Sequence, residues 1–136
     1  MNYSILLAAN ALIGSFITLA SKNKSFQYFV ILNLIATWLI YSLMWLNFNP
    51  SGDLQYSFML PWLPSLGSQL LFGMDGISLI MVGLSIFMVT IVSVHAITTQ
   101  PRHQMILCAL FLMIEFMLIG LFSAQDAIVF FLCYEG

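Results

Sequence analysis

The chain has 136 residues, of which 62% are hydrophobic and only 6% charged, and its formal net charge at pH 7 is −2. Its mean hydropathy of +1.04 lies far outside the range of water-soluble domains, so that class is excluded. We therefore expect an integral membrane protein that has lipid, and no nucleic acid, around it. Cys108 and Cys133 both lie in apolar runs without metal-ligand spacing, which predicts neither a disulfide framework nor a metal site.

Uncharged stretches define the expected helices in chain order. Residues 1–21, 25–52 and 76–101 carry no charge, and each stretch reaches the roughly 20 residues that cross a hydrocarbon core. A fourth run is interrupted only by Glu115, and a fifth, beginning at Asp126, is too short to span. The sequence predicts an all-α integral membrane domain over 1–136, with four full helices near 3–21, 27–46, 76–98 and 105–123 and the first half of a fifth at 126–136.

Residues 47–75 form the longest segment outside these spans, and Pro50, Pro61 and Pro64 prevent a continuous helix there. From residue 54 to 58 apolar and polar side chains alternate, as in a half-buried strand, and residues 69–72 are placed to pair back after the proline-rich turn. We expect a short external hairpin between the second and third helices.

Charge segregation predicts the orientation. The basic residues all follow odd-numbered spans: Lys22, Lys24 and Arg102. The loop acids all fall on the opposite side: Asp53, Asp75 and Asp126. Because basic residues favour the cytoplasmic or matrix side, the N-terminus is expected on the external side.

Polar residues also recur at helical spacing within the first two spans. They are Asn10, Gly14 and Thr18 on the first and Asn33, Thr37 and Tyr41 on the second. Such residues either line a wet path or join helices that approach closely in lipid, and the second role is the more common.

Glu115 is the most informative residue, because it lies near the middle of the fourth span. An ionised acid at the centre of a membrane helix costs about 3 kcal/mol, so such residues usually face a cavity or a partner. Burial favours the protonated form of a carboxyl group, which makes Glu115 a candidate for binding and releasing protons. The alternative is a protonated acid that only bonds a neighbouring helix.

Glu135 follows Asp126 by nine residues, which corresponds to a rise of about 13 Å and places it near mid-membrane. Asp126 and Asp75 each directly precede a predicted helix, so both are expected to cap helix N-termini. His95, in the last two turns of the third span, is a candidate proton relay or a satisfied interfacial residue.

Four segments resemble chain 4 of NADH:ubiquinone oxidoreductase, respiratory complex I. Residues 61–67 read Pro-Trp-Leu-Pro-Ser-Leu-Gly, and residues 72–79 read Phe-Gly-Met-Asp-Gly-Ile-Ser-Leu. Residues 112–123, Leu-Met-Ile-Glu-Phe-Met-Leu-Ile-Gly-Leu-Phe-Ser, and 126–135, Asp-Ala-Ile-Val-Phe-Phe-Leu-Cys-Tyr-Glu, resemble that family's fourth and fifth helices. Complex I chains 2 and 5 and cation/proton antiporter subunits share this outline, but the second segment favours chain 4.

The resemblance implies the N-terminal portion of a proton-translocating subunit of the membrane arm. Glu135 would match the family's fifth-helix glutamate, which pairs with a lysine on a later helix, and Glu115 its fourth-helix glutamate. No cofactor is expected on this chain, with NAD, FMN, iron-sulfur clusters and ubiquinone bound elsewhere in the complex. The expected alternatives are a cation/proton antiporter subunit and a non-catalytic membrane scaffold.

The sequence departs from the family in having no lysine after Lys24. We therefore expect a split subunit, whose remaining portion on a companion chain supplies the lysines, with chains 2 and 5 as further partners. The scarcity of charge and the 12 phenylalanines resemble an organelle-encoded chain. The expected location is the mitochondrial inner membrane with the N-terminus on the intermembrane-space side, and a bacterial or plastid membrane is the alternative.

Overall fold

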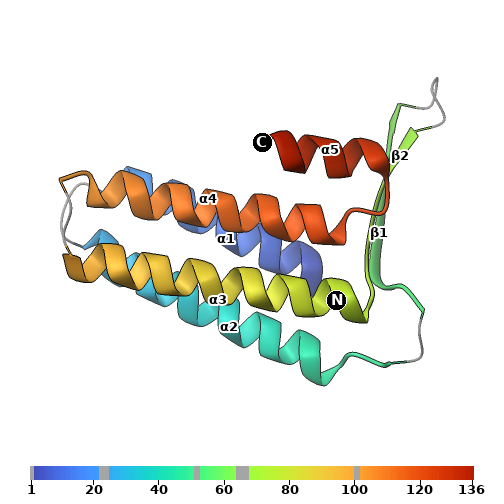
Figure 1. Cartoon of the computed structure of the whole chain (residues 1–136), viewed down its shortest axis with the longest axis horizontal. Coiled ribbons are helices and arrows are strands. Elements are labelled where there is room, and N and C mark those ends of the chain that lie inside the picture. Colours follow the sequence, from blue (N-terminus) through green and yellow to red (C-terminus); the bar gives the residue numbers. More distant parts are fainter. Residues whose placement is uncertain (1, 22–24, 51–52, 64–67, 100–101) are drawn as a thin grey trace.

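A computed structural model describes residues 2–21, 25–50, 53–63, 68–99 and 102–136. The elements in chain order are α1 (Tyr3–Ala20), α2 (Phe26–Leu46), β1 (Gln55–Leu63), β2 (Ser68–Met74), α3 (Gly76–Thr99), α4 (Gln104–Ser123) and α5 (Ala127–Glu135) (Figure 1). Within the described residues, α1 to α4 are the 4 helices long and apolar enough to cross a membrane. The predicted all-α membrane class is therefore confirmed, and each helix end differs from its expected position by one residue at most.

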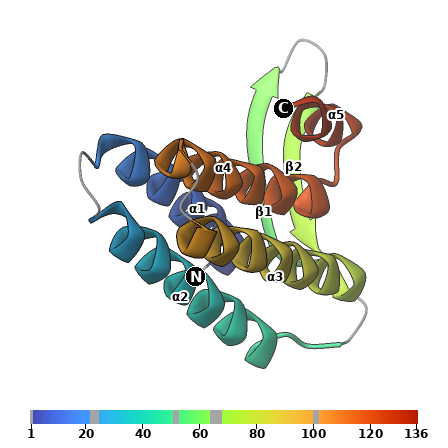
Figure 2. The ribbon, with the colours of Figure 1, turned by 60° about the vertical axis from the view of Figure 1, so that its left-hand side comes forward.

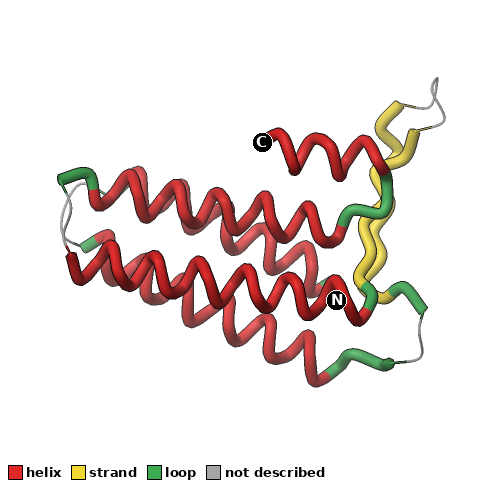
Figure 3. The backbone as a smooth tube through the Cα atoms, in the orientation of Figure 1, coloured by secondary structure: helices red, strands yellow, loops and turns green. Residues whose placement is uncertain are grey.

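The four long helices lie side by side, and successive helices run in opposite directions (Figures 1 and 2). α4 packs against α1 and α3, α2 packs against α1, and α5 lies on the outer side of α4. The C-terminal ends of α1 and α3 and the N-terminal ends of α2 and α4 lie at one end of the bundle, here named the loop end, and the strands lie at the other, the hairpin end (Figures 1 and 3).

Two clusters of buried apolar side chains form the core. The hairpin-end cluster comprises Leu7, Ala11, Met44, Met74, Leu79, Val82, Ile86 and Ile119. The loop-end cluster comprises Phe26, Val30, Leu34, Ala96, Cys108 and Leu112. Apolar side chains also cover much of the outer helix surface, for example Phe16 at 61% and Leu39 at 61% exposed. Such a surface suits hydrocarbon as the surrounding solvent.

The predicted hairpin is present, because β1 and β2 pair antiparallel with Phe58 opposite Phe72 and Pro61 opposite Gln69. The pairing shifts between Gln55 and Phe58, where Tyr56 has a positive φ of 54°. This irregularity turns Tyr56 onto the bundle: its hydroxyl donates to the Met44 carbonyl at 3.0 Å and its ring packs edge-on against Tyr3. The regular alternation expected for residues 54–58 is therefore interrupted by a bulge.

The α4–α5 connection is attached to the same hairpin. The Gln125 backbone N–H donates to the Leu71 carbonyl at 2.8 Å, and the Gln125 side-chain amide donates to the Gly73 carbonyl at 3.2 Å. These bonds fix where α5 begins relative to the hairpin end of the bundle, and so they set the depth that its later residues reach.

Candidate functional site

Glu115 lies on the buried face of α4, one turn from Leu112 on one side and one turn from Ile119 on the other. Leu112 belongs to the loop-end cluster and Ile119 to the hairpin-end cluster, so the carboxyl group lies where the two apolar clusters meet. The residue is 0% exposed. Neither of its carboxyl oxygens has a hydrogen-bond partner within the described part of the chain.

An unpartnered buried carboxyl group is unusual, since buried polar atoms nearly always find a partner in protein or ordered water. The charged form would carry the largest desolvation cost in such a place, so this environment favours the neutral acid. Water or another hydrogen-bond donor that reached this position would bind at these two carboxyl oxygens.

Glu115 and Glu135 reach the same depth. Glu115 is eight residues before Ser123 and Glu135 is eight residues after Ala127, so each lies about 12 Å from the hairpin end of its own helix at 1.5 Å per residue. The two helices are antiparallel neighbours in contact with each other. Both carboxyl groups therefore lie near the middle of a hydrocarbon core about 30 Å thick.

The two glutamates nevertheless face different surroundings. α5 packs on α4 through Cys133, whose sulfur lies so close to Gly120 that a Cβ there would be 2.8 Å from it. Glu135 itself is exposed on the outer surface of α5, whereas Glu115 is enclosed by the four-helix bundle. The structure of this chain thus places the two candidate residues at one level without bringing them together.

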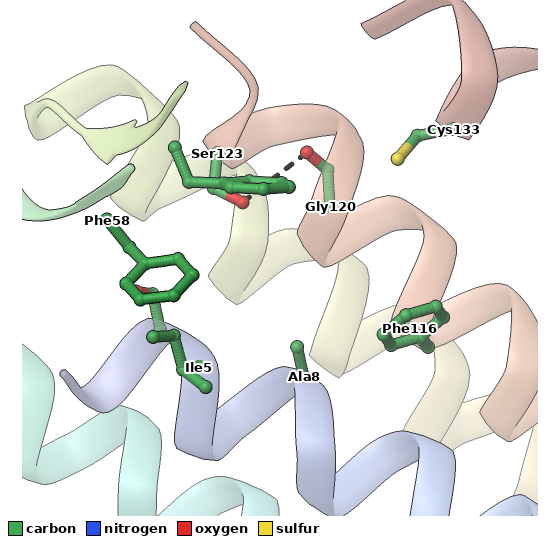
Figure 4. A pocket seen from close by; sticks show the side chains of 9 residues that line it. Ile5, Ala8, Phe58, Phe116, Gly120, Ser123 and Cys133 are labelled. Atoms are coloured by element: carbon green, nitrogen blue, oxygen red, sulfur yellow. Dashed lines mark hydrogen bonds between the residues drawn. The ribbon is translucent and has the colours of Figure 1, made fainter. Parts of the chain in front are cut away.

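A cavity of about 230 Å³ separates the bundle from α5 at the hairpin end (Figure 4). Phe58, Phe116 and Cys133 line it together with Gly120 and Ser123. Its lining hydroxyls already donate to carbonyls, for example Ser123 to Ile119. The cavity is therefore an apolar space, and neither glutamate is among the residues that line it.

The remaining candidates lie away from both glutamates. His95 is exposed near the loop end of α3, with its ring Nε2 3.4 Å from the Thr99 hydroxyl. Asp126 accepts a hydrogen bond from the Ile128 N–H at 3.1 Å and lies at the N-cap of α5. Within the described ranges, no group of three or more His, Cys, Asp or Glu residues is placed to hold a metal ion.

Asp75 caps α3 in a similar way, accepting from the Ser78 backbone N–H at 2.7 Å. Hydrogen bonds from the Ser78 side chain and backbone hold the pKa of the Asp75 carboxyl below its ordinary value. The carboxylate form is thus the one that stabilises the start of α3.

The polar residues of the first two helices bond chiefly to one another. The Asn10 amide donates to the Thr37 hydroxyl at 2.9 Å, and the Asn33 amide donates to the Asn10 carbonyl at 2.9 Å. Of the two roles weighed from the sequence, this geometry favours helix packing. In the part of the chain that the structure describes, the Asn33 side-chain oxygen and the Ser93 hydroxyl are buried without a hydrogen-bond partner. The sequence did not predict this, and its only signal was the position of Asn33 inside an apolar span.

No protein-family model matches the chain. Among curated proteins it is 32% identical to "NADH-ubiquinone oxidoreductase chain 4" of Chondrus crispus over 142 aligned residues, covering 99% of this chain and 28% of that protein. It is 29% identical to the protein of the same name from Arabidopsis thaliana, covering 91% of this chain and 26% of the relative. "NADH-quinone oxidoreductase subunit M" of Rhodobacter capsulatus is also 29% identical, with 85% and 22% covered. The chain thus spans about a quarter of the length of these relatives.

Proposed function

We propose that this chain, which is homologous to a segment of the chain 4 subunits of NADH:quinone oxidoreductases, forms the first helices of an antiporter-like subunit that translocates protons in the membrane arm of such an enzyme. The chain carries no redox chemistry itself. Oxidation of NADH and reduction of quinone take place elsewhere in the complex, on subunits that hold NAD, FMN, iron-sulfur clusters and ubiquinone.

The burial of Glu115 carries the proposal. Glu115 is a fully enclosed acid in the middle of a membrane-spanning helix, and within the described residues neither of its oxygens accepts or donates a hydrogen bond. Such a group is costly for stability and needs a reason to be present. Holding an exchangeable proton is such a reason, because a neutral carboxyl group tolerates the apolar surroundings and releases its proton when water or a cation approaches.

Glu135 is the second proton-carrying group, and it is completed from outside this chain. It is exposed at mid-depth, and the sequence contains no lysine after Lys24 to pair with it. A lysine from the remainder of the subunit, on a companion chain, would stabilise the carboxylate when close and favour its protonation when withdrawn. His95, near the loop end, is the proposed exit or entry relay.

The surroundings of the chain follow from the same proposal. Its partners are the companion portion of the subunit and the other membrane-arm subunits, chains 2 and 5 among them. The location is the mitochondrial inner membrane, with the hairpin end and the N-terminus on the intermembrane-space side. Arg102 lies at the opposite, loop end of the bundle, which supports that orientation. The names of the relatives, which are subunits of NADH-ubiquinone and NADH-quinone oxidoreductases, favour this function over a cation/proton antiporter.

The decisive experiment replaces Glu115 by Gln in the assembled complex and measures protons moved per NADH oxidised in sealed membrane vesicles. Glu115→Gln keeps the shape but removes the exchangeable proton, so we expect translocation to fall on the order of tenfold while the subunit composition stays intact. Glu115→Asp, which retains a titratable carboxyl group, should restore part of the translocation.

Asp126→Asn is the matched control, because Asn also caps a helix and Asp126 lies outside the apolar interior. It should leave translocation unchanged. Normal translocation by a fully assembled Glu115→Gln complex would mean that the glutamate only bonds between helices, as in a membrane scaffold.

A further inference from the structure

The cavity between the bundle and α5 is enclosed by four parts of the chain, none of which fills it. Its volume is about 230 Å³. The hairpin contributes Phe58 and Phe72 to the lining, α4 contributes Phe116, and α1 and α5 contribute Ala8 and Cys133. Figure 4 shows Ala8 and Cys133 facing this space from opposite sides. The cavity therefore lies where segments far apart in the sequence meet.

Both hydroxyl groups in the lining already donate hydrogen bonds to the protein. Ser4 donates to the Tyr56 carbonyl at 3.2 Å, and Ser123 donates to the Ile119 carbonyl. The other lining residues are apolar except for Cys133, whose thiol is only a weak donor. A buried water needs roughly two to four polar partners, and an apolar cavity of about 150 Å³ in another protein stays dry and binds benzene. The lining therefore suits an apolar ligand.

The shape of the cavity suits an unbranched chain. On α4 the lining extends from Ser123, the last residue of the helix, to Phe116, which lies seven residues or about 10 Å deeper in the membrane. A helix of that length, about 10 Å across, would fill several times the volume of the cavity. A single leucine or phenylalanine side chain is shorter than the cavity. A hydrocarbon chain spans its length and fits its width.

α5 cannot move inward to close the cavity. The Cys133 sulfur lies so close to Gly120 that a Cβ there would be 2.8 Å from it, so α5 already touches α4 at this point. At the start of α5, Gln125 donates hydrogen bonds to the Gly73 and Leu71 carbonyls of the hairpin. These contacts fix the width of the space. Because the lining of an empty void loses dispersion contacts, a ligand that fills this one stabilises the position of α5.

Acyl chains are the apolar molecules that surround the protein at this depth. Ile5 lines the cavity and is 41% exposed, so the cavity adjoins the lipid-facing surface of α1. We infer that an acyl chain of a membrane phospholipid enters beside Ile5 and occupies the cavity under α5. This inference does not depend on the proton-carrying role of the glutamates.

The test reconstitutes the purified membrane assembly that contains this chain in vesicles of phosphatidylcholine carrying a diazirine on one acyl chain. After irradiation, mass spectrometry locates the lipid adducts. Phe116 should be labelled, as should Phe16, which is 61% exposed on the outer surface of α1 and serves as the reference. Ala8→Leu places a larger side chain in the cavity, so it should lower the labelling of Phe116 severalfold and leave that of Phe16 unchanged.

Ala9→Leu is the matched control, because it makes the same substitution at the neighbouring, exposed position of α1. Labelling of Phe116 should survive Ala9→Leu. A wild-type assembly in which Phe16 is labelled and Phe116 is not would overturn the inference, since another part of the assembly would then fill the cavity. Equal labelling of Phe116 in wild type and Ala8→Leu would overturn it as well.

Discussion

The two intramembrane glutamates have the same depth and opposite surroundings. Glu115 is enclosed by four helices of its own chain and is 0% exposed, while Glu135 lies exposed on the outer side of α5. One face of α4 is packed along its length, and the face that carries α5 retains a groove of about 410 Å³ lined by Met117 and Tyr134 among others. Within the described residues, Glu115 therefore has closed surroundings and Glu135 has open ones.

The difference shows how the same residue type at the same depth acquires different properties. The protonation of an enclosed acid depends mainly on desolvation by the side chains around it, whereas the protonation of an exposed acid depends on the charges that approach it. Changes at Glu135 should thus alter its interaction with approaching charges, and changes at Glu115 should alter proton exchange inside the bundle.

The largest effect is expected from Glu135→Gln in the assembled enzyme. Gln cannot attract the proposed lysine or carry a proton, so proton translocation per NADH should fall on the order of tenfold or more, with little change in the melting temperature of the complex. Vesicle pH measurements and thermal denaturation check the two parts. If Glu135→Gln instead reduced assembly while each remaining complex translocated protons normally, Glu135 would serve the structure. The functional comparison between the exposed Glu135 and the enclosed Glu115 would then fail.

Gly14→Ala should lower stability by about 1–3 kcal/mol, because the added methyl group overlaps the Asn33 side chain and forces α1 and α2 apart. Gly76→Ala is the matched control, since its Cβ would meet only Phe48 at 3.9 Å, an ordinary contact. Thermal denaturation of the purified complexes measures both. Equal midpoints for the two variants would show that the α1–α2 contact is looser than described.

Glu115→Leu should separate function from stability in the enclosed region. Leucine fills a similar volume and removes the unpartnered polar atoms, so stability should be unchanged or rise by about 1 kcal/mol. Proton translocation should fall on the order of tenfold, as expected for Glu115→Gln, because both changes remove the carboxyl group. A destabilised complex would indicate that Glu115 is hydrogen-bonded in the assembly and serves the structure.

The smallest effect is expected at the α3 cap. The pKa of Asp75 is lowered by the hydrogen bonds from Ser78, so the carboxylate contributes stability above its unfolded-state pKa, and this contribution is lost as the pH falls through the lowered folded-state pKa. Asp75→Ala should cost about 1 kcal/mol at neutral pH. The difference between wild type and Asp75→Ala should vanish under strongly acidic conditions in pH-dependent denaturation.

Much of the fold follows from local sequence. Apolar runs, free of charge except for Glu115 in the fourth, located the long helices to within one residue. Acids directly before helices marked the positions where Asp75 and Asp126 bond the first turns. The proline-rich turn and the apolar pattern indicated the hairpin. These features depend on neighbouring residues alone, which a single sequence displays.

The site is less accessible from sequence, because it depends on which face of a helix is covered. Spacing placed both glutamates at mid-membrane but could not distinguish the enclosed Glu115 from the exposed Glu135, a difference that arises from the packing of α1, α3 and α5 on α4. The free oxygen of Asn33 and the bulge at Tyr56 likewise result from contacts between distant segments.

The account rests on Glu115 holding a proton that moves during turnover, and infrared difference spectroscopy of the complex during NADH oxidation tests this most directly. With isotope-labelled glutamate, the spectrum should contain a band from a protonated glutamic acid in apolar surroundings that changes on turnover and is absent in Glu115→Gln. Glu135→Gln should keep the resting band while altering its change on turnover. A spectrum in which Glu115→Gln removes no such band would contradict the central claim.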